Sequence, residues 1–278
     1  MTAFDHSGAR SPAHMDFLRE YANWERVNRL HITFDVDWAP DYMIQHALDI
    51  LQPYDVGVTF FATHETPLLK KIAAEGRHEV GVHPNLAPES SQGKGFDAVF
   101  RSLASWYPGA IGCRFHVLDF SYRDLKRLPE RGIRYDVSRL MYNISHLQPA
   151  YHRDLDLILL PYMWEDGICE NARDEVSTES MRLDAPGLKV LNFHPMNVFL
   201  NVPNADVRLD FKKDLGSVAI ANCPEERARR HRVEGDTGAQ RALEGLLARI
   251  KRDGLIVRPL RDLYKAFAAV SGKEASCD

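Results

Sequence analysis

The sequence of 278 residues lacks several features that would assign a class directly. It contains no run of 18 apolar residues, so no transmembrane helix is expected. It contains no glycine-rich phosphate loop, which removes the best support for a nucleotide-binding fold. The formal net charge is −4 and no basic run is present. This charge pattern argues against nucleic acid or an anionic membrane surface as a partner.

Cysteine is scarce in this chain. The four cysteines, Cys113, Cys169, Cys223 and Cys277, lie far apart and form no Cys-x-x-Cys motif. This spacing excludes a zinc–thiolate pattern, and we expect free thiols. The first ten residues are polar and carry no hydrophobic signal core, so we expect a cytoplasmic location.

Apolar, β-prone segments alternate with helical patterns seven or eight times along residues 30–270. Such alternation is typical of a parallel sheet with helices outside it, and this number of units favours a barrel. We therefore predict an α/β protein, a distorted (β/α) barrel of about seven parallel strands. Residues 1–29 are predicted to form a helical extension, residues 195–236 an irregular excursion and residues 271–278 a tail.

Several segments carry the clearest local signals. The apolar spacing over residues 12–28 predicts an amphipathic helix. Strands are expected over residues 56–62, 111–117 and 155–164 because these runs are apolar and β-prone. Gly76 is expected to end a short helix.

Two carboxylates follow the first predicted strand, which runs from Leu30 to Phe34. In an extended chain Asp35 and Asp37 point to the same side, so their charges need a metal ion, an arginine or a shared proton. The alternative is that one of them caps the next helix, since aspartate is a preferred N-cap residue. Pro40 ends the strand in either case.

Further polar side chains are expected where the other strands end. In parallel α/β folds the carboxyl ends of the strands form the site. The residues delivered there are His64, His83, Asn85, Arg114, His116, Asp136, Trp164, Asp166 and His194. Arg114 and His116 are two residues apart, so we expect them on one face of their strand.

This set suits metal-assisted acyl hydrolysis. Asp37 and His83 are an ordinary ligand pair for zinc or another first-row divalent metal. Asp35 would take the proton of the attacking water, and Arg114 would keep Asp35 ionised. His194 could protonate the leaving group. Each residue also has a structural alternative: a lone histidine can be a satisfied core residue, and an arginine a plain ion-pair partner.

Trp164 offers a flat apolar wall suited to the face of a sugar, although most tryptophans are core residues.

Three motifs resemble those of a known family. Residues 33–37 (Thr-Phe-Asp-Val-Asp) resemble the Thr-Phe-Asp-Asp motif of the polysaccharide deacetylases, the NodB-like domain of carbohydrate esterase family 4, with one residue inserted. Residues 58–61 resemble its Ala-Thr-Phe-Phe, and residues 76–83 its Gly-His-Glu-Ile-Gly-Asn-His. The sequence is most similar to the WbmS-like branch linked to O-antigen biosynthesis, through residues 83–85, 114–116 and 193–195.

The resemblance implies a distorted (β/α) barrel that hydrolyses an acetamido group on a sugar. It implies the following roles: Asp35 as base, Arg114 as its partner, His194 as acid, Asp37 and His83 as metal ligands, and Asn85, His116 and Trp164 as substrate-binding residues. The family's second metal-binding histidine, four residues after the first, is replaced here by Ala87. A third ligand could be Asn85, His116, His64 or a water, and His116 is our first choice.

We therefore predict a metal-dependent deacetylase, with zinc as the favoured divalent metal and an N-acetylated sugar or oligosaccharide as the substrate. Two alternatives stay open: a metal-independent amidohydrolase acting on a small amide, and a catalytically inactive carbohydrate-binding relative.

Overall fold

The computed structural model describes residues 29–171 and 174–270. The predicted helix over residues 12–28 and the predicted tail over residues 271–278 lie outside the described residues. Within the described part, no helix is long and apolar enough to cross a membrane.

Among the described residues, ten strands form one sheet in the order β6-β7-β5-β4-β3-β2-β1-β9-β8, and β10 pairs with β1. All pairings are parallel except that of β6 with β7. The strands are β1 (Arg29–Asp35), β2 (Thr59–Ala62), β3 (Glu79–Val82), β4 (Gly112–Cys113), β5 (Tyr135–Asp136), β6 (Ala150–His152), β7 (Leu157–Leu159), β8 (Trp164–Glu165), β9 (Val190–Phe193) and β10 (Ile256–Val257).

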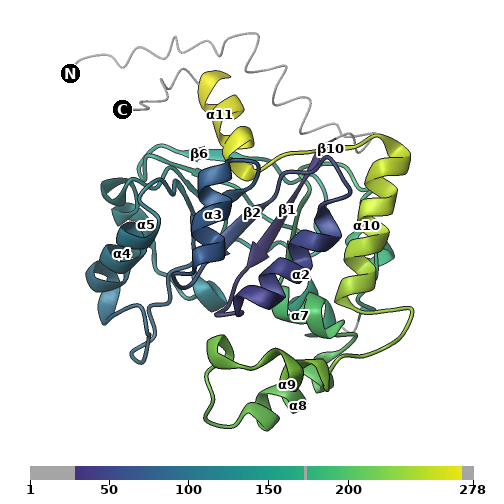
Figure 1. The fold of residues 1–278 in the computed structure, drawn as a ribbon. Helices are drawn as coiled ribbons and strands as arrows, with labels where there is room; N and C mark the ends of the chain where they lie inside the picture. The colour runs from purple at the N-terminus through teal and green to yellow at the C-terminus, as the bar shows by residue number, and fades with distance from the viewer. Residues whose placement is uncertain (1–28, 172–173, 271–278) are drawn as a thin grey trace, which may run out of the picture.

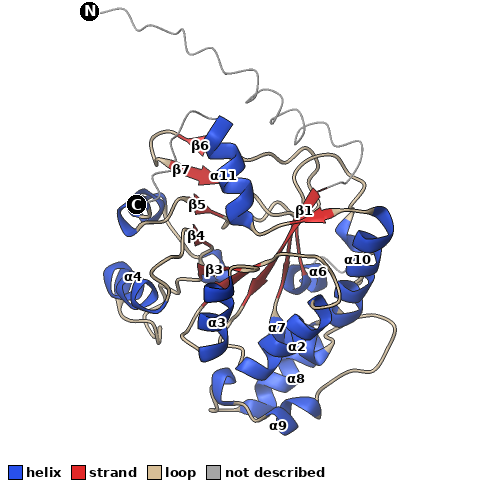
Figure 2. Ribbon diagram, turned by 45° about the horizontal axis from the view of Figure 1, so that its top comes forward, coloured by secondary structure: helices blue, strands red, loops and turns tan. Residues whose placement is uncertain are grey.

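Helices connect these strands and cover the outside of the sheet (Figure 2). The helices are α2 (Asp41–Leu51), α3 (Pro67–Glu75), α4 (Gly95–Trp106), α5 (Tyr122–Arg127), α6 (Asp166–Asn171), α7 (Pro195–Leu200), α8 (Ala205–Leu215), α9 (Glu225–Arg229), α10 (Ala239–Asp253) and α11 (Leu260–Val270). The part of the chain that the structure describes also contains four 3₁₀ turns: η1 (His116–Leu118), η2 (Pro129–Arg131), η3 (Glu179–Met181) and η4 (Ile220–Asn222).

The two sides of the curled sheet meet beyond the ends of the ladders. Leu140, after β5, forms a parallel bridge with Tyr162, before β8. The backbone N–H of Met141 donates to the Tyr162 carbonyl at 2.8 Å. This contact completes a ring of parallel segments, so the predicted distorted (β/α) barrel is confirmed.

The ends of the barrel are covered differently (Figure 1). Helices α8 and α9 lie at the end of the sheet toward which β1 runs, whereas α11 lies at the opposite end. Because sites of parallel α/β proteins form at the carboxyl ends of strands, α8 and α9 lie on the side where a site is expected.

Alternation along β1 separates an apolar outside from a polar inside. Phe34 stacks on Phe60 with ring centroids 5.0 Å apart and packs against Phe193 at 5.9 Å. The neighbouring positions Thr33 and Asp35 point the other way, since successive residues of a strand face opposite sides. Both are buried, at 0% and 4% exposure, so the barrel interior contains polar groups that must be satisfied there.

Helix α3 shows how local sequence sets element boundaries. The Thr66 hydroxyl accepts the backbone N–H of Leu69 and caps the helix, and Pro67 occupies its first position. Gly76 ends it with φ 72°, as predicted, because glycine adopts the left-handed conformation without strain.

Three predictions of local structure are wrong. The strand expected over residues 155–164 is instead the short strand β7 (Leu157–Leu159) followed by a separate strand, β8, that begins at Trp164. The strand expected over residues 111–117 is only Gly112–Cys113, because His116 starts the 3₁₀ turn η1. The excursion expected to be irregular is mostly helical, since it contains α7, α8 and α9. Helix α8 buries only Phe211 and Leu215 of its apolar residues, so its sequence period was too weak to detect.

Candidate active site

Asp35 and Asp37 converge through a turn rather than through an extended strand. Asp35 is the last residue of β1, whereas Asp37 has φ 46°, in the left-handed region. The backbone N–H of Trp38 donates to the Thr63 hydroxyl at 2.8 Å and fixes this turn. The predicted proximity of the two carboxylates is correct, but the extended geometry from which it was inferred is wrong. A non-glycine residue at positive φ is a conformation often found at functional sites.

The helix-capping alternative for these carboxylates is excluded. Helix α2 has Pro40 at its N-cap position and no side-chain capping hydrogen bond. Both carboxylates instead face His83: its Nε2 lies 3.8 Å from Asp35 Oδ2 and 3.2 Å from Asp37 Oδ1. His83 follows β3 and is 2% exposed.

His116 completes a three-residue cluster with Asp37 and His83. Its Nδ1 lies 3.1 Å from Asp37 Oδ1 and 3.4 Å from His83 Nε2. Donor atoms bound at 2.0–2.2 Å to one tetrahedral ion are roughly 3.3–3.6 Å apart. The three edges of the cluster, 3.1, 3.2 and 3.4 Å, are close to that spacing, so the residues present fit a divalent metal.

The tautomer of His83 also suits a metal ligand. Its Nδ1 lies 2.5 Å from the Arg114 carbonyl, which can only accept a hydrogen bond. Nδ1 therefore carries a proton, which leaves Nε2 facing the cluster as the atom that could bind a metal. Second-shell bonds of this kind orient histidine ligands in metal sites.

A buried network holds Asp35. Arg114 Nη1 donates to Asp35 Oδ1 at 2.9 Å, and Asn192 Nδ2 donates to Asp35 Oδ2 at 2.9 Å. Arg114 Nη1 also reaches the Thr33 hydroxyl, and its Nε donates to the Val137 carbonyl at 3.1 Å. Arg114 and Asn192 are both 0% exposed. The predicted pairing of Arg114 with Asp35 is therefore present, and it orients both carboxylate oxygens together with Asn192.

His194 lies on the other side of Asp37. Its Nε2 is 3.7 Å from Asp37 Oδ2, and its Nδ1 is 2.6 Å from Asp166 Oδ1. Asp166 is 0% exposed and also accepts the backbone N–H of His194 at 2.9 Å. The buried carboxylate thus fixes the ring of His194 and leaves Nε2 directed toward the cluster.

The charges of the site shift its pKa values. Burial would lower the pKa of His194, but the charge of Asp166, its hydrogen bond and the charges of Asp37 and Glu165 together raise that pKa well above its usual value. Burial would likewise lower the pKa of His83, but Asp35 and Asp37 raise it. Burial would raise the pKa of Asp37, but hydrogen bonds with His116 and His83 hold it well below its usual range. Without a metal, these shifts favour cationic imidazoles at His83 and His194 beside the anionic carboxylate of Asp37.

Three sequence-predicted residues lie apart from this arrangement. Trp164 is 0% exposed and packs against Phe193, so its ring cannot present a face to a sugar, and that assignment is corrected. The Asn85 side chain accepts the backbone N–H of Ala87 at 3.0 Å within its own turn. The His64 Nδ1 contacts the neighbouring Thr63 hydroxyl and lies outside the three-residue cluster.

The sequence analysis gave no role to two residues of the buried network: Asn192 was not identified, and Glu165 was expected only as a residue at a strand end. Asn192 stands two positions before His194 on β9, so strand alternation could have placed it on the inner face. Glu165 Oε2 accepts from Tyr162 Oη at 2.9 Å and from Asn192 Nδ2 at 3.3 Å. Burial raises the pKa of Glu165. No motif signal distinguished Glu165 from an ordinary strand-end carboxylate.

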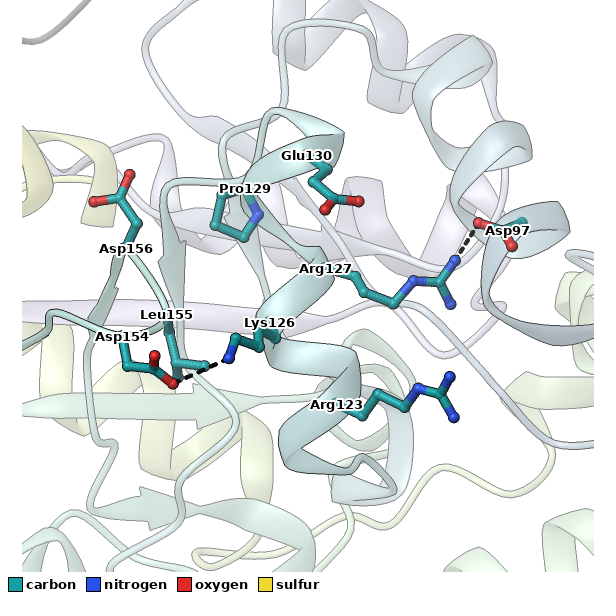
Figure 3. A pocket seen from close by; sticks show the side chains of 9 residues that line it. All are labelled: Asp97, Arg123, Lys126, Arg127, Pro129, Glu130, Asp154, Leu155 and Asp156. Carbon is teal, nitrogen blue, oxygen red and sulfur yellow. Dashed lines mark hydrogen bonds and ion pairs between the residues drawn. The ribbon is translucent and has the colours of Figure 1, made fainter.

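A surface cavity of about 760 Å³ lies elsewhere, beside α5 (Figure 3). Two ion pairs lie in its lining: Arg127 with Asp97, and Lys126 with Asp154 at 3.4 Å. None of the residues that converge near Asp35 lines it, so we do not assign the chemistry to this cavity.

Comparison with known proteins identifies the family. The family model described as WbmS-like polysaccharide deacetylase matches residues 32–210. The chain belongs to the WbmS-like polysaccharide deacetylases. No match was found among the curated proteins. The WbmS-like match contains every residue of the cluster and of the buried network around Asp35.

Solved structures agree with this family assignment. A crystal structure from Bordetella bronchiseptica, described as a polysaccharide deacetylase involved in O-antigen biosynthesis, is 31% identical with a TM-score of 0.70. The match covers 80% of this chain and 91% of that one. A polysaccharide deacetylase structure from Mycobacterium smegmatis, 16% identical, covers 90% of this chain and 93% of its own with a TM-score of 0.55, which shows the shared fold.

Proposed function

We propose that this WbmS-like polysaccharide deacetylase is a metal-dependent hydrolase that removes the N-acetyl group of a sugar in surface polysaccharide or O-antigen biosynthesis. The observation that carries the proposal is the placement of Asp35. This carboxylate lies beside a three-donor cluster, and a histidine with a raised pKa lies on the other side of that cluster.

The residues that would hold the metal are Asp37, His83 and His116. Two imidazoles and a carboxylate are a donor set typical of catalytic zinc, which keeps a further position open. When bound, the ion would polarise the amide carbonyl and acidify water. The alternative of a catalytically inactive relative was based on Ala87, which replaces the family's second metal-binding histidine. His116 offers a third donor atom instead, so Ala87 no longer supports that alternative.

Two side chains of the protein each carry out one proton transfer of the hydrolysis. Asp35 accepts the proton of the attacking water, with Arg114 and Asn192 fixing the direction of its lone pairs. His194 gives a proton to the leaving amine nitrogen, and Asp166 keeps the ring oriented and charged. Hydrolysis of an amide needs both transfers because amide nitrogen is a poor leaving group until it is protonated.

The test is zinc stoichiometry and deacetylation of N-acetyl sugars measured on the same samples. We expect one zinc per chain in the wild type, and at least tenfold weaker binding after Asp37→Ala or His116→Ala. His64→Ala is the matched control, since His64 lies near the site but outside the cluster.

Asp35→Asn should keep zinc and lose about 10²–10⁴-fold in kcat, the usual contribution of a general base. Full activity in metal-free protein would instead establish the metal-independent amidohydrolase.

A further inference from the structure

A glycine at the start of α6 marks a close approach to the candidate site. Gly167 is buried and sits in a right-handed helix, where alanine would be favoured by about 1 kcal/mol. A Cβ at this position would lie 3.1 Å from Arg208 Nη1, 3.5 Å from Glu165 Oε1 and 3.8 Å from His194 Cε1. The absence of a side chain at Gly167 therefore lets the Arg208 guanidinium lie close to the acid of the reaction.

Arg208 reaches this place from outside the barrel. It belongs to α8, which packs near α6 at the end of the sheet toward which β1 runs (Figure 1). Arg208 is partly exposed, whereas Arg114 is fully buried behind Asp35. Of these two guanidinium groups beside the site, only Arg208 can meet a bound molecule.

The position of Arg208 is on the leaving-group side. His194 is assigned to protonate the departing amine, so the sugar and whatever it is attached to lie near His194. A guanidinium carries five N–H donors in a planar fork, which suits carboxylate and phosphate groups. A guanidinium that already makes one contact therefore keeps further N–H donors for an anion.

We propose that Arg208 is a substrate-binding residue that recognises an anionic group on the sugar or on its carrier. This inference rests on the proposed deacetylase function, which places the sugar beside His194. The shared chemistry is an oxyanion: either the carboxylate of an acidic sugar or the phosphate of a phosphate-linked sugar.

The test compares three N-acetylated sugars that differ in charge: a neutral hexosamine, its uronic acid, and its 1-phosphate. Kinetics and calorimetric binding are measured for the wild type, Arg208→Met, Arg208→Lys and Gly167→Ala. A charge-assisted contact is worth about 1.5–3 kcal/mol, so Arg208→Met should raise KM and Kd for the preferred anion about 10–100-fold. The same variant should change neither value more than twofold for the neutral sugar.

The other variants separate binding from packing. Gly167→Ala should weaken anion binding without lowering Tm, because the one tight contact of the added methyl, at 3.1 Å, is with the end of the flexible Arg208 side chain. Arg208→Lys should recover part of the preference for the anion. Lys212→Met, an exposed residue of the same helix, is the control and should leave all values unchanged. Comparing binding of the uronic acid with binding of the 1-phosphate shows which of the two anions is bound.

Two results would overturn the role of Arg208: a wild type that binds neither anionic sugar better than the neutral one, or an Arg208→Met that lowers Tm with unchanged discrimination. The second outcome would make Arg208 a packing contact between α8 and α6. If anions bind selectively but no sugar is hydrolysed, the deacetylase proposal fails while the binding role of Arg208 stands.

Discussion

Replacing Arg114 by methionine would leave the Asp35 carboxylate buried with no cation beside it. Arg114 is 0% exposed, and its guanidinium donates to Asp35, Asn192, Thr33 and the Val137 carbonyl. Its Cζ also lies 4.2 Å from the centroid of the Tyr162 ring. Methionine fills much of the same volume but satisfies none of these acceptors.

The cost can be estimated from the burial of the pair. Removing one member of a buried, hydrogen-bonded ion pair costs about 3–5 kcal/mol, because the other charge is left uncompensated. The free energy of unfolding of a typical domain is about 5–15 kcal/mol, so Arg114→Met should remove a large share of it. Neutralising the partner should relieve most of the penalty. The double variant Arg114→Met, Asp35→Asn is therefore expected to be about 2 kcal/mol more stable than Arg114→Met alone.

The assay is urea unfolding in the presence of a chelator, so that metal binding does not add to the free energy of unfolding. Arg101→Met is the matched control, since Arg101 is an exposed arginine of α4, and it should change stability by less than about 0.5 kcal/mol. An Arg114→Met variant as stable as that control would refute the reasoning. Additive effects of the Arg114 and Asp35 substitutions would do so as well, because they would show that the pair is not coupled.

Three further outcomes are expected. Burial raises the pKa of Asp136 to about 6 from 3.8, so the folded protein binds this proton more tightly than the unfolded chain. The wild type therefore loses stability as pH rises. In urea titrations, the free energy of unfolding of Asp136→Asn should rise by about 2 kcal/mol relative to that of the wild type between pH 4.5 and 8. A difference that stays constant over this range would contradict the prediction. Asp166→Asn should lower the pKa of His194 and move the alkaline limb of the rate profile to lower pH, whereas an unmoved limb would show that Asp166 does not tune the acid. Val117 has φ 48°, so Val117→Gly should raise the unfolding free energy by roughly 0.5–1 kcal/mol, and a lower Tm would argue against backbone strain there.

Much of the fold was predictable because its signals are local. Alternating strand and helix patterns, the end of α3 at Gly76 and the break at Pro40 all follow from propensities read along the chain. The exact lengths of β4 and β5 were not predictable, since only two residues of each pair with neighbours. Ladder length depends on where adjacent strands curl apart, and that depends on tertiary packing.

The candidate site was predictable to the extent that its residues stand at strand ends. Asp35, Asp37, His83, Arg114 and His194 converge as expected. A strand-end position does not, however, decide whether a large side chain turns outward or into the core. Trp164 illustrates this limit, because its ring packs inside and its indole N–H donates to Ser180 at 3.0 Å.

The missed partners have a common cause. Asn192 matters because it joins Asp35 on β1 to Glu165 on β8, and a single sequence carries no signal for a contact between segments far apart in the chain. Arg208 is harder to predict from the sequence than Asn192, because it belongs to α8, a helix whose apolar period is weak. What pointed to it was the close approach of its guanidinium to Gly167, which only coordinates can show.

The departure at Ala87 also has a structural explanation. The family motif places a second histidine four residues after the first, in the segment that follows β3. In this chain the third donor comes instead from His116, three residues beyond the end of β4. Arg114 lies between Cys113, the last residue of β4, and His116, so one short segment would supply both the partner of the proposed base and a proposed metal ligand. The register of β4 against β3 therefore positions Asp35 and the metal donors together, and a shift of this segment would disturb both at once.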